Sequence, residues 1–193
     1  IKLVISKKEG LEKIVNLVNG KLRIPFKIEC IEKYLIHSYL TPFNLQKKLS
    51  LNSSSDLNNY WLAGFVDADG SFQIKILERE KRVLPEIRLN LKIDQKKNDL
   101  LNLIQKQFGG NIGYRRSQNT YYYGSTNFGC AKAFINYFDK YHLLSTKYLN
   151  YCMWRKAYII IQEKNHLTLE GLSKIKQLKM SMNRYLNCSE NIV

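Results

Sequence analysis

Two carboxylates that stand two residues apart, Asp67 and Asp69, are the side chains whose type and spacing point most directly to chemistry. They close a stretch that is predicted to be helical from Trp61, and Gly70 is suited to the left-handed position that often follows a helix. Negative charge is disfavoured at the C-terminal end of a helix dipole. A divalent cation resolves this conflict, because Mg²⁺ is typically bound by one or two carboxylates together with phosphate oxygens and water. A solvated or capping carboxylate is the common alternative at a helix end.

The helix that ends on these carboxylates has an unusual composition. Gly64 and Ala68 stand four residues apart, Ala63 lies beside them, and bulkier apolar residues fill the positions between. Small residues one turn apart allow two helix backbones to approach closely. We therefore expect Ala63, Gly64 and Ala68 to form an interface with a second helix.

The nine residues 62–70, LAGFVDADG, resemble the LAGLIDADG motif of homing endonucleases and related intron maturases, and seven of the nine positions are identical. The resemblance implies that the last aspartate of the motif, Asp69, binds a divalent metal ion such as Mg²⁺, and that Asp67 has a mainly structural role. It also implies that two motif helices pack together, so that two acidic helix ends meet near the scissile phosphates. Paired divalent metals then activate water, stabilise developing charge and assist the leaving oxygen.

Two further catalytic candidates are implied by the same resemblance. Residues 93–96, IDQK, are similar to the family segment whose glutamine lies beside the catalytic water, which points to Gln95. Residues 143–148, LLSTKY, are similar to the segment that carries the active-site lysine, which points to Lys147. The expected catalytic set is therefore Asp69, Gln95 and Lys147. For Lys147, a solvated side chain or a contact to phosphate that adds only nonspecific affinity is the alternative.

The elements that must position these residues can be predicted from periodicity. Apolar and polar side chains alternate over 71–76 and again over 86–94, which predicts two strands with one buried face. A helical period follows over 96–108, and 111–116 with 120–125 are typical of a hairpin. Three more helices are expected at 127–141, 145–163 and 167–186. The order αββαββα from residue 58, with two extra C-terminal helices, predicts an α+β fold, and the resemblance implies a curved antiparallel four-stranded sheet.

The polar face of the predicted sheet is rich in side chains that bind nucleic acid. Cationic and amide side chains contact phosphates and base edges, and a two-stranded ribbon fits the major groove of B-DNA. A merely solvated face is the alternative, and these residue types favour nucleic-acid contact over it. The candidate contact residues, which include the hairpin, are Gln73, Lys75, Arg79, Arg88, Asn90, Lys92, Arg115, Arg116, Gln118, Tyr121 and Tyr123.

The overall charge also points to a polyanionic partner. The chain has 193 residues, and its 31 Lys and Arg residues against 16 Asp and Glu residues give a formal net charge of +15. Nucleic acid or an acidic membrane surface attracts such a chain, but no run of about 18 apolar residues is present to span a bilayer. The four cysteines and three histidines are too scattered for a zinc site or a disulfide framework.

Three parts are expected along the chain. Residues 1–40 are predicted to be largely helical, and residues 5–25 resemble the end of the first repeat in two-motif LAGLIDADG proteins of fungal mitochondrial introns. Residues 41–57 are a linker candidate because they contain Pro42 and a serine run, and residues 58–193 are predicted to form the LAGLIDADG domain. The bias towards Lys, Asn, Ile and Tyr is typical of an AT-rich organellar genome, and it favours a location in the mitochondrial matrix.

Three functions remain open on the sequence. The intact set of Asp69, Gln95 and Lys147 favours a sequence-specific endonuclease that cleaves double-stranded DNA in intron homing. The intron resemblance and the lysine-rich C-terminal helices favour an RNA-binding group I intron maturase, and the presence of one motif favours a structural RNA-binding subunit of a larger ribonucleoprotein. Cleavage requires a second LAGLIDADG repeat, supplied by homodimerisation or by a separate chain. Charge alone does not separate duplex DNA from structured RNA.

Overall fold

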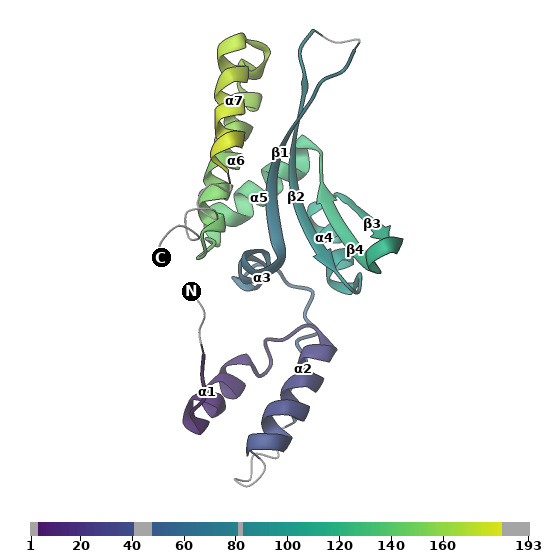
Figure 1. The fold of residues 1–193 in the computed structure, drawn as a ribbon, viewed down its shortest axis with the longest axis vertical. Helices are drawn as coiled ribbons and strands as arrows, with labels where there is room; N and C mark the ends of the chain where they lie inside the picture. The colour runs from purple at the N-terminus through teal and green to yellow at the C-terminus, as the bar shows by residue number, and fades with distance from the viewer. Residues whose placement is uncertain (1–3, 41–47, 81–82, 183–193) are drawn as a thin grey trace. The chain divides into compact units, whose positions relative to one another are not determined.

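The chain forms two compact units, with the boundary between Ser55 and Asp56. The computed structural model describes residues 4–40, 48–80 and 83–182, apart from the side chains of residues 37–40. Each unit has a hydrophobic core of its own, and Figure 1 shows the helices and strands of both.

The first unit is helical. It contains α1 (Lys8–Val18), α2 (Pro25–Ile31) and the π-helical segment η1 (Glu32–Leu40), which continues α2. Proline is well suited to the first position of α2, because the N–H that it lacks has no intrahelical partner there. The core of this unit consists of Val15, Ile28, Ile36 and Leu49.

Part of the expected linker belongs to the first unit. Leu49 is buried in its core and donates its N–H to Glu32 Oε1 over 3.0 Å. The N–H of Gly20 donates to the carbonyl oxygen of Ser50 over 3.1 Å. Leu57, by contrast, is buried in the core of the second unit. Two residues of the predicted linker, Leu49 and Leu57, therefore pack in the cores of the two folded units, and its first part, residues 41–47, lies outside the described residues.

The second unit has the element order that the sequence predicts. A helix, two strands, a helix and two strands are followed by three helices, which confirms the αββαββα order with two further helices. The elements are α3 (Trp61–Asp69), β1 (Gly70–Leu77), β2 (Glu86–Gln95), α4 (Asp99–Phe108), β3 (Asn111–Arg115), η3 (Arg116–Gln118), β4 (Thr120–Ser125), α5 (Phe128–Lys140), α6 (Lys147–Gln162), η4 (Asn165–Leu167) and α7 (Leu169–Ser181).

The four strands form one antiparallel sheet in the order β1-β2-β4-β3, which confirms the predicted α+β fold. Gln73 lies opposite Asn90 in the first strand pair, and Lys92 lies opposite Gly124 in the next pair. Because side chains alternate between the two faces of a strand, this register places one set of polar residues on a common face. The other face is apolar.

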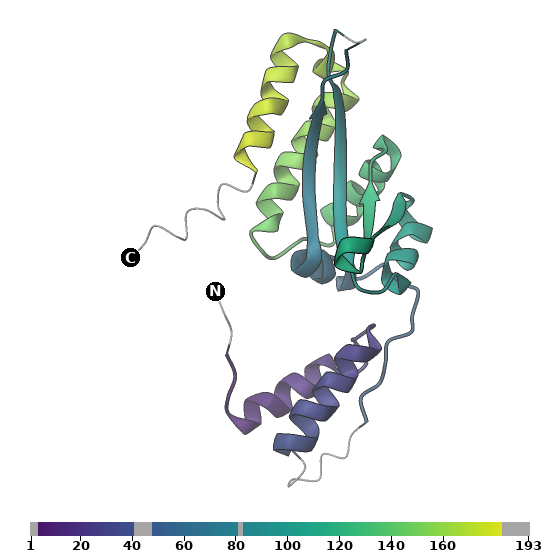
Figure 2. The same ribbon diagram turned by 45° about the vertical axis from the view of Figure 1, so that its right-hand side comes forward.

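Helices cover the apolar face. In the second unit α6 packs against β1, α5 against β2, and α4 against β3 and β4. Figure 2 shows α6 and α7 running side by side next to the long β1–β2 hairpin. The opposite face of the sheet carries the polar residues of the strands.

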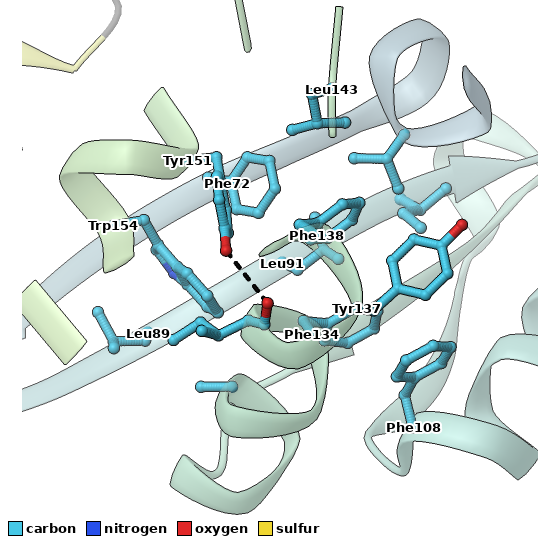
Figure 3. Close-up of a cluster of buried hydrophobic side chains, with 14 of the residues drawn as sticks. Phe72, Leu89, Leu91, Phe108, Phe134, Tyr137, Phe138, Leu143, Tyr151 and Trp154 are labelled. Atoms are coloured by element: carbon cyan, nitrogen blue, oxygen red, sulfur yellow. Dashed lines mark hydrogen bonds between the residues drawn. The ribbon is translucent and has the colours of Figure 1, made fainter. Parts of the chain in front are cut away.

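The core of the second unit is aromatic (Figure 3). Phe72 of β1 lies with its ring centroid 5.6 Å from those of Phe138 and Tyr151 and 5.5 Å from that of Trp154. Such edge-to-face and tilted pairs are favourable beyond the apolar area they bury. They fix α5 and α6 against β1, and α6 begins with one of the expected catalytic residues.

The last predicted helix begins close to the expected position. Thr168 accepts a hydrogen bond from Gly171 N–H and caps α7. The predicted extension over residues 183–186 lies outside the described residues. None of the helices in the described part of the chain combines the length and apolar composition needed to cross a membrane.

Candidate active site and nucleic-acid interface

The helix α3 is seated with one side in the core. Leu62 and Val66 are fully buried there. Gly70 follows the helix with an extended backbone, φ −84° and ψ 158°, so the left-handed cap expected at this residue is wrong. The glycine is needed for close approach, because a Cβ there would lie 2.6 Å from Val66 Cγ1 and 2.8 Å from Val66 O. The chain can therefore turn directly from α3 into β1.

The three expected catalytic side chains lie together at the C-terminal end of α3. Gln95, the last residue of β2, donates a hydrogen bond from Nε2 to Asp69 Oδ2 over 2.6 Å. Lys147, the first residue of α6, donates from Nζ to the carbonyl oxygens of Ala68 at 2.9 Å and Val66 at 3.3 Å. Three elements that are distant in the sequence thus converge on one helix end.

Lys147 neutralises the negative end of α3. Its ammonium group binds carbonyl oxygens in the last turn of the helix, where cations are favoured. Burial lowers the pKa of Lys147, while the carboxylates of Asp67 and Asp69 act in the opposite direction by favouring the charged ammonium. The side chain is therefore an electrostatic part of the cluster rather than a freely solvated lysine.

Asp67 has a different environment from Asp69. Its Oδ2 accepts a hydrogen bond from Leu144 N–H at 2.7 Å, and its Oδ1 accepts from the N–H of Ser145 at 3.3 Å and from the Ser145 hydroxyl. These donors lie just before α6, so Asp67 joins the end of α3 to the start of the helix that carries Lys147. The sequence reasoning missed both partners, because a backbone N–H has no signature in sequence.

The N-terminal end of α3 is also held from α5. The Tyr137 hydroxyl accepts a hydrogen bond from Ala63 N–H at 3.2 Å and donates to the carbonyl of Asn59. The Tyr141 hydroxyl donates to the carbonyl of Asn58 over 2.7 Å. Residues 137–147 therefore contact α3 at both ends. Nothing in the sequence distinguishes these two tyrosines from ordinary apolar positions of a helix.

The outer side of α3 is exposed and consists of small and aromatic residues. Gly64 and Ala68 are exposed, and a Cβ at Gly64 would have no atom of the described residues within 4 Å. Trp61 and Phe65 stack beside them with ring centroids 5.0 Å apart. Ala63, however, is 2% exposed and belongs to the core, so its expected place in a helix interface is wrong.

Asp69 is suited to binding a divalent metal ion. Its carboxylate is exposed at the helix end, in contrast to that of Asp67, which accepts three hydrogen bonds from the protein. Mg²⁺ and Ca²⁺ both take carboxylate oxygens together with water or phosphate oxygens. Asp69 therefore fits as one carboxylate ligand of such an ion.

Basic side chains on the polar face of the sheet are held by acidic neighbours. Asp94 contacts Lys92 Nζ at 3.0 Å and Arg115 Nη2 at 3.2 Å. Arg115 also donates to Gln118 Oε1 over 3.2 Å and lies over the ring of Tyr122 at 4.9 Å. These contacts hold Arg115 between two strands and the η3 turn. Arg116, the first residue of that turn, is exposed.

A second acid holds two arginines nearer the β1–β2 turn. Glu86 contacts Arg88 Nε at 2.5 Å and Arg79 Nη2 at 3.2 Å. Hydrogen bonding to Arg88 is the main reason why the pKa of Glu86 lies below its ordinary value. Lys75, opposite Arg88 in the register, is exposed on the same face. The sheet therefore presents cations along its length.

Two tyrosines expected on this face lie on the other one. Tyr123 is fully buried and donates its hydroxyl to Gly109 O over 2.8 Å, and burial raises the pKa of this tyrosine. Tyr121 is half-buried on the same inner side. Tyr122 instead lies on the polar face, where Arg115 covers its ring. Three consecutive tyrosines hide the alternation of the strand, so the sequence carries no signal for which one points outward.

Asn90 requires a third correction. It lies on the polar side of β2, yet it is only 4% exposed. Its Nδ2 donates to Gln73 Oε1 of β1 over 3.0 Å, and Gln73 itself is half-buried. The side chain of Asn90 is therefore too deeply buried to contact a base or a phosphate itself.

Residues 62–158 match the family described as LAGLIDADG endonuclease. A cox1 intron-2 protein of 37.2 kDa from Schizosaccharomyces pombe is 56% identical over 178 residues, which cover 92% of this chain and 54% of the relative. The intron-encoded DNA endonuclease aI3 of Saccharomyces cerevisiae is 28% identical over 193 residues, 79% of this chain and 46% of the relative.

Solved structures of homing endonucleases are also similar to this chain. The structure of I-SmaMI bound to an uncleaved DNA target in the presence of calcium ions superposes with a TM-score of 0.62 and 32% identity, over 91% of this chain and 59% of that one. The chain spans about half the length of the two curated relatives. The chain belongs to the LAGLIDADG endonuclease family, and the matched residues 62–158 contain nearly all of α3, the whole four-stranded sheet and most of α6.

Proposed function

We propose that this chain forms half of a sequence-specific endonuclease that cleaves double-stranded DNA. The observation that carries the proposal is the convergence of Asp69, Gln95 and Lys147 at one helix end, with Gln95 Nε2 2.6 Å from Asp69 Oδ2. Phosphodiester hydrolysis needs an oriented water molecule and compensation of negative charge. A carboxylate, an amide and an ammonium group at one point are suited to these tasks.

Each residue has a distinct part in the proposal. Asp69 holds a divalent ion, Mg²⁺ in the cell, which when bound lowers the pKa of water and offsets charge at the phosphate. Gln95 orients the attacking water, since its amide can donate and accept at the same time. Lys147 adds positive charge beside the scissile phosphate while it keeps the end of α3 in place. Asp67 fixes the geometry by accepting hydrogen bonds from Leu144 and Ser145, just before α6.

A second motif helix completes the site. The exposed face of Gly64 and Ala68 supports close packing against another such helix, because neither residue has a side chain beyond one methyl group. The second repeat comes from a second copy of this chain or from another polypeptide segment. That the chain spans 54% of its 56% identical relative supports an assembly with a further repeat.

The polar face of the sheet binds the duplex in this proposal. Lys75 contacts a phosphate in this proposal, and Lys92, Arg88 and Arg115 contact phosphates and base edges. The likeness to I-SmaMI bound to DNA supports a DNA partner. The cox1 intron origin of a relative supports expression of the gene in mitochondria and action in the matrix.

The test is cleavage of a large randomised duplex library by the purified chain in Mg²⁺, with Asp69→Asn alongside. We expect the wild type to cleave one set of related target sequences and Asp69→Asn to cleave none. If a single chain does not pair, the same assay on a tandem fusion of two copies supplies the second helix. Failure of both forms to cut, with intact folding, would overturn the proposal.

A second candidate, an RNA-binding maturase, is favoured by one observation. Exposed lysines recur along α6 and α7, at Lys156, Lys174, Lys176 and Lys179, and such a surface attracts folded RNA as well as duplex DNA. A parallel measurement of binding to a group I intron transcript tests it. Tight RNA binding without any DNA cleavage would select this candidate over the endonuclease.

A further inference from the structure

Asn90 occupies a position on the sheet that DNA contact does not explain. It lies on the polar side of β2 between Arg88 and Lys92, and Gln73 of β1 is its partner in the register. Its exposure is only 4%. Asn90 therefore lies on the same face of the sheet as the candidate contact residues, but it is buried beneath the surface that they form.

Asn90 instead controls the side chain next to it. Its Nδ2 donates to Gln73 Oε1 over 3.0 Å, and Gln73 Nε2 in turn lies 3.5 Å from the hydroxyl of Ser71. An isolated glutamine can exchange its amide oxygen and nitrogen by rotating the terminal bond. Here the donor on Asn90 fixes the oxygen towards β2 and the nitrogen towards Ser71.

Folding alone does not account for an asparagine at this place. Asn90 Oδ1 is buried and has no hydrogen-bond partner among the described residues. A Cβ at Gly124 would lie 3.3 Å from this oxygen, so the absence of a side chain on Gly124 leaves room for the amide. A buried carbonyl without a partner is destabilising, and an apolar residue of similar shape avoids that penalty. The asparagine is therefore better explained by what it does to Gln73.

We infer that Asn90 is a positioning residue that sets the amide orientation of Gln73 for recognition of an adenine base. The inference rests on the proposed DNA-binding function of the sheet. A glutamine amide pairs with adenine in the major groove by accepting from N6 and donating to N7, which requires its oxygen and nitrogen to be on defined sides. Gln73 keeps one N–H and one oxygen lone pair for this contact. Asn90 touches Gln73 and not the base.

The test compares base preferences of Gln73→Ala, Asn90→Leu and the double variant with the wild type. Each full-length protein is bound to target duplexes in which every position is varied in turn. Loss of one bidentate contact reduces discrimination by about tenfold or more. We expect Gln73→Ala and Asn90→Leu to lose the preference for A·T at the same single position. The double variant should lose no more base preference than Gln73→Ala does, because both substitutions remove the same contact.

Control measurements separate the possible outcomes. Lys75→Ala, on the same face, should lower affinity equally for all sequences, and the melting temperature of Asn90→Leu should equal or exceed that of the wild type. Asn90→Leu with unchanged base preference would overturn the inference. A lower melting temperature with uniformly weaker binding would also overturn it, in favour of a structural role. Absence of base preference in the wild type itself would overturn the proposed function as well.

Discussion

The acidic end of α3 and the polar face of the sheet are built in opposite ways. At the helix end, Asp69 and Gln95 are 26 residues apart, and Ala68 and Lys147 are 79 residues apart. On the sheet face, three arginine contacts span two, three and seven residues of sequence, and the contact of Arg115 with Asp94 spans 21. The first arrangement exists only in the folded domain, whereas most contacts of the second form within a hairpin, apart from that between Arg115 and Asp94.

This difference predicts different responses to substitution. The helix-end cluster depends on a small number of atoms from three elements, so one change can remove its chemistry. On the sheet, two acids each hold two basic side chains, and cations are spread along the strands. Loss of one cation there leaves the others in place. Variants at the cluster should therefore act on cleavage, and variants on the face should act on binding in small steps.

The largest effect is expected for Asp69→Asn. Removal of a metal ligand forfeits several kcal/mol of transition-state stabilisation, so the cleavage rate should fall by at least about 10³-fold. Binding to the uncleaved target should change little, because the sheet face is intact. Cleavage rate and affinity measured side by side in Mg²⁺ test this, with the exposed acid of α4 changed in Asp99→Asn as the matched control. Cleavage by Asp69→Asn at the wild-type rate would remove Asp69 from the site.

The next effect is expected at the outer side of α3. Gly64→Leu inserts a bulky side chain where two helices are to meet, and overpacking of this kind weakens pairing by about 10- to 100-fold. Folding of the single domain should be unaffected, because a Cβ at this position meets no atom of the described residues within 4 Å. Sedimentation on target DNA, with the melting temperature as a control, measures both quantities. An unchanged ratio of protein to DNA in the complex would place the interface elsewhere.

Gly70→Ala should destabilise the domain instead. The added Cβ would lie 2.6 Å from Val66 Cγ1 and 2.8 Å from Val66 O, and the main chain must shift to admit it. The expected loss is about 1–3 kcal/mol of unfolding free energy. Urea denaturation measures it, and Gly64→Ala in α3, the helix that precedes Gly70, is the matched control without a steric conflict. Equal stability of the two variants would show that the close approach at Gly70 is not required.

Asp67→Asn should have a smaller effect of the same kind. The neutral amide keeps one acceptor but loses charge-assisted hydrogen bonds to Leu144 and Ser145. We expect a loss of about 1 kcal/mol in unfolding free energy, which urea denaturation measures. The cleavage rate should fall only to the extent that the substitution displaces Lys147. A loss of cleavage equal to that of Asp69→Asn would mean that Asp67 has a direct part in the reaction.

The sequence predicts the secondary structure of this molecule better than its tertiary packing. The alternation of Phe72, Ile74 and Ile76 defines a strand by itself, so the strands, their polar face and the element order could be predicted. The resemblance to the family pointed to Asp69 in the motif and to Gln95 and Lys147 in two other segments, and the fold brings the three together. Positions that depend on packing could not be predicted in this way.

Three errors show why. Ala63 is small, as an interface residue should be, but the rotation of α3 about its axis places it in the core. Tyr123 is buried because β4 pairs with β2 in a register that three consecutive tyrosines conceal. Asn90 alternates correctly and is nevertheless covered by its neighbours. In each case the residue type was compatible with the expected role, and the packing of neighbouring elements decided exposure.

The smallest effect is expected for Lys75→Ala on the sheet face. Lys75 is exposed on β1 opposite Arg88, and removal of one phosphate contact should weaken binding a few-fold and lower the slope of log affinity against log salt by about 1. The loss should be equal for all sequences, and the cleavage rate at saturating protein should stay unchanged. Lys106→Ala, on α4 away from this face, is the control that should leave the salt slope as it is. A drop in the cleavage rate of the saturated Lys75→Ala complex would mean that the sheet face and the helix-end cluster are coupled, and that their separation into binding and chemistry is wrong.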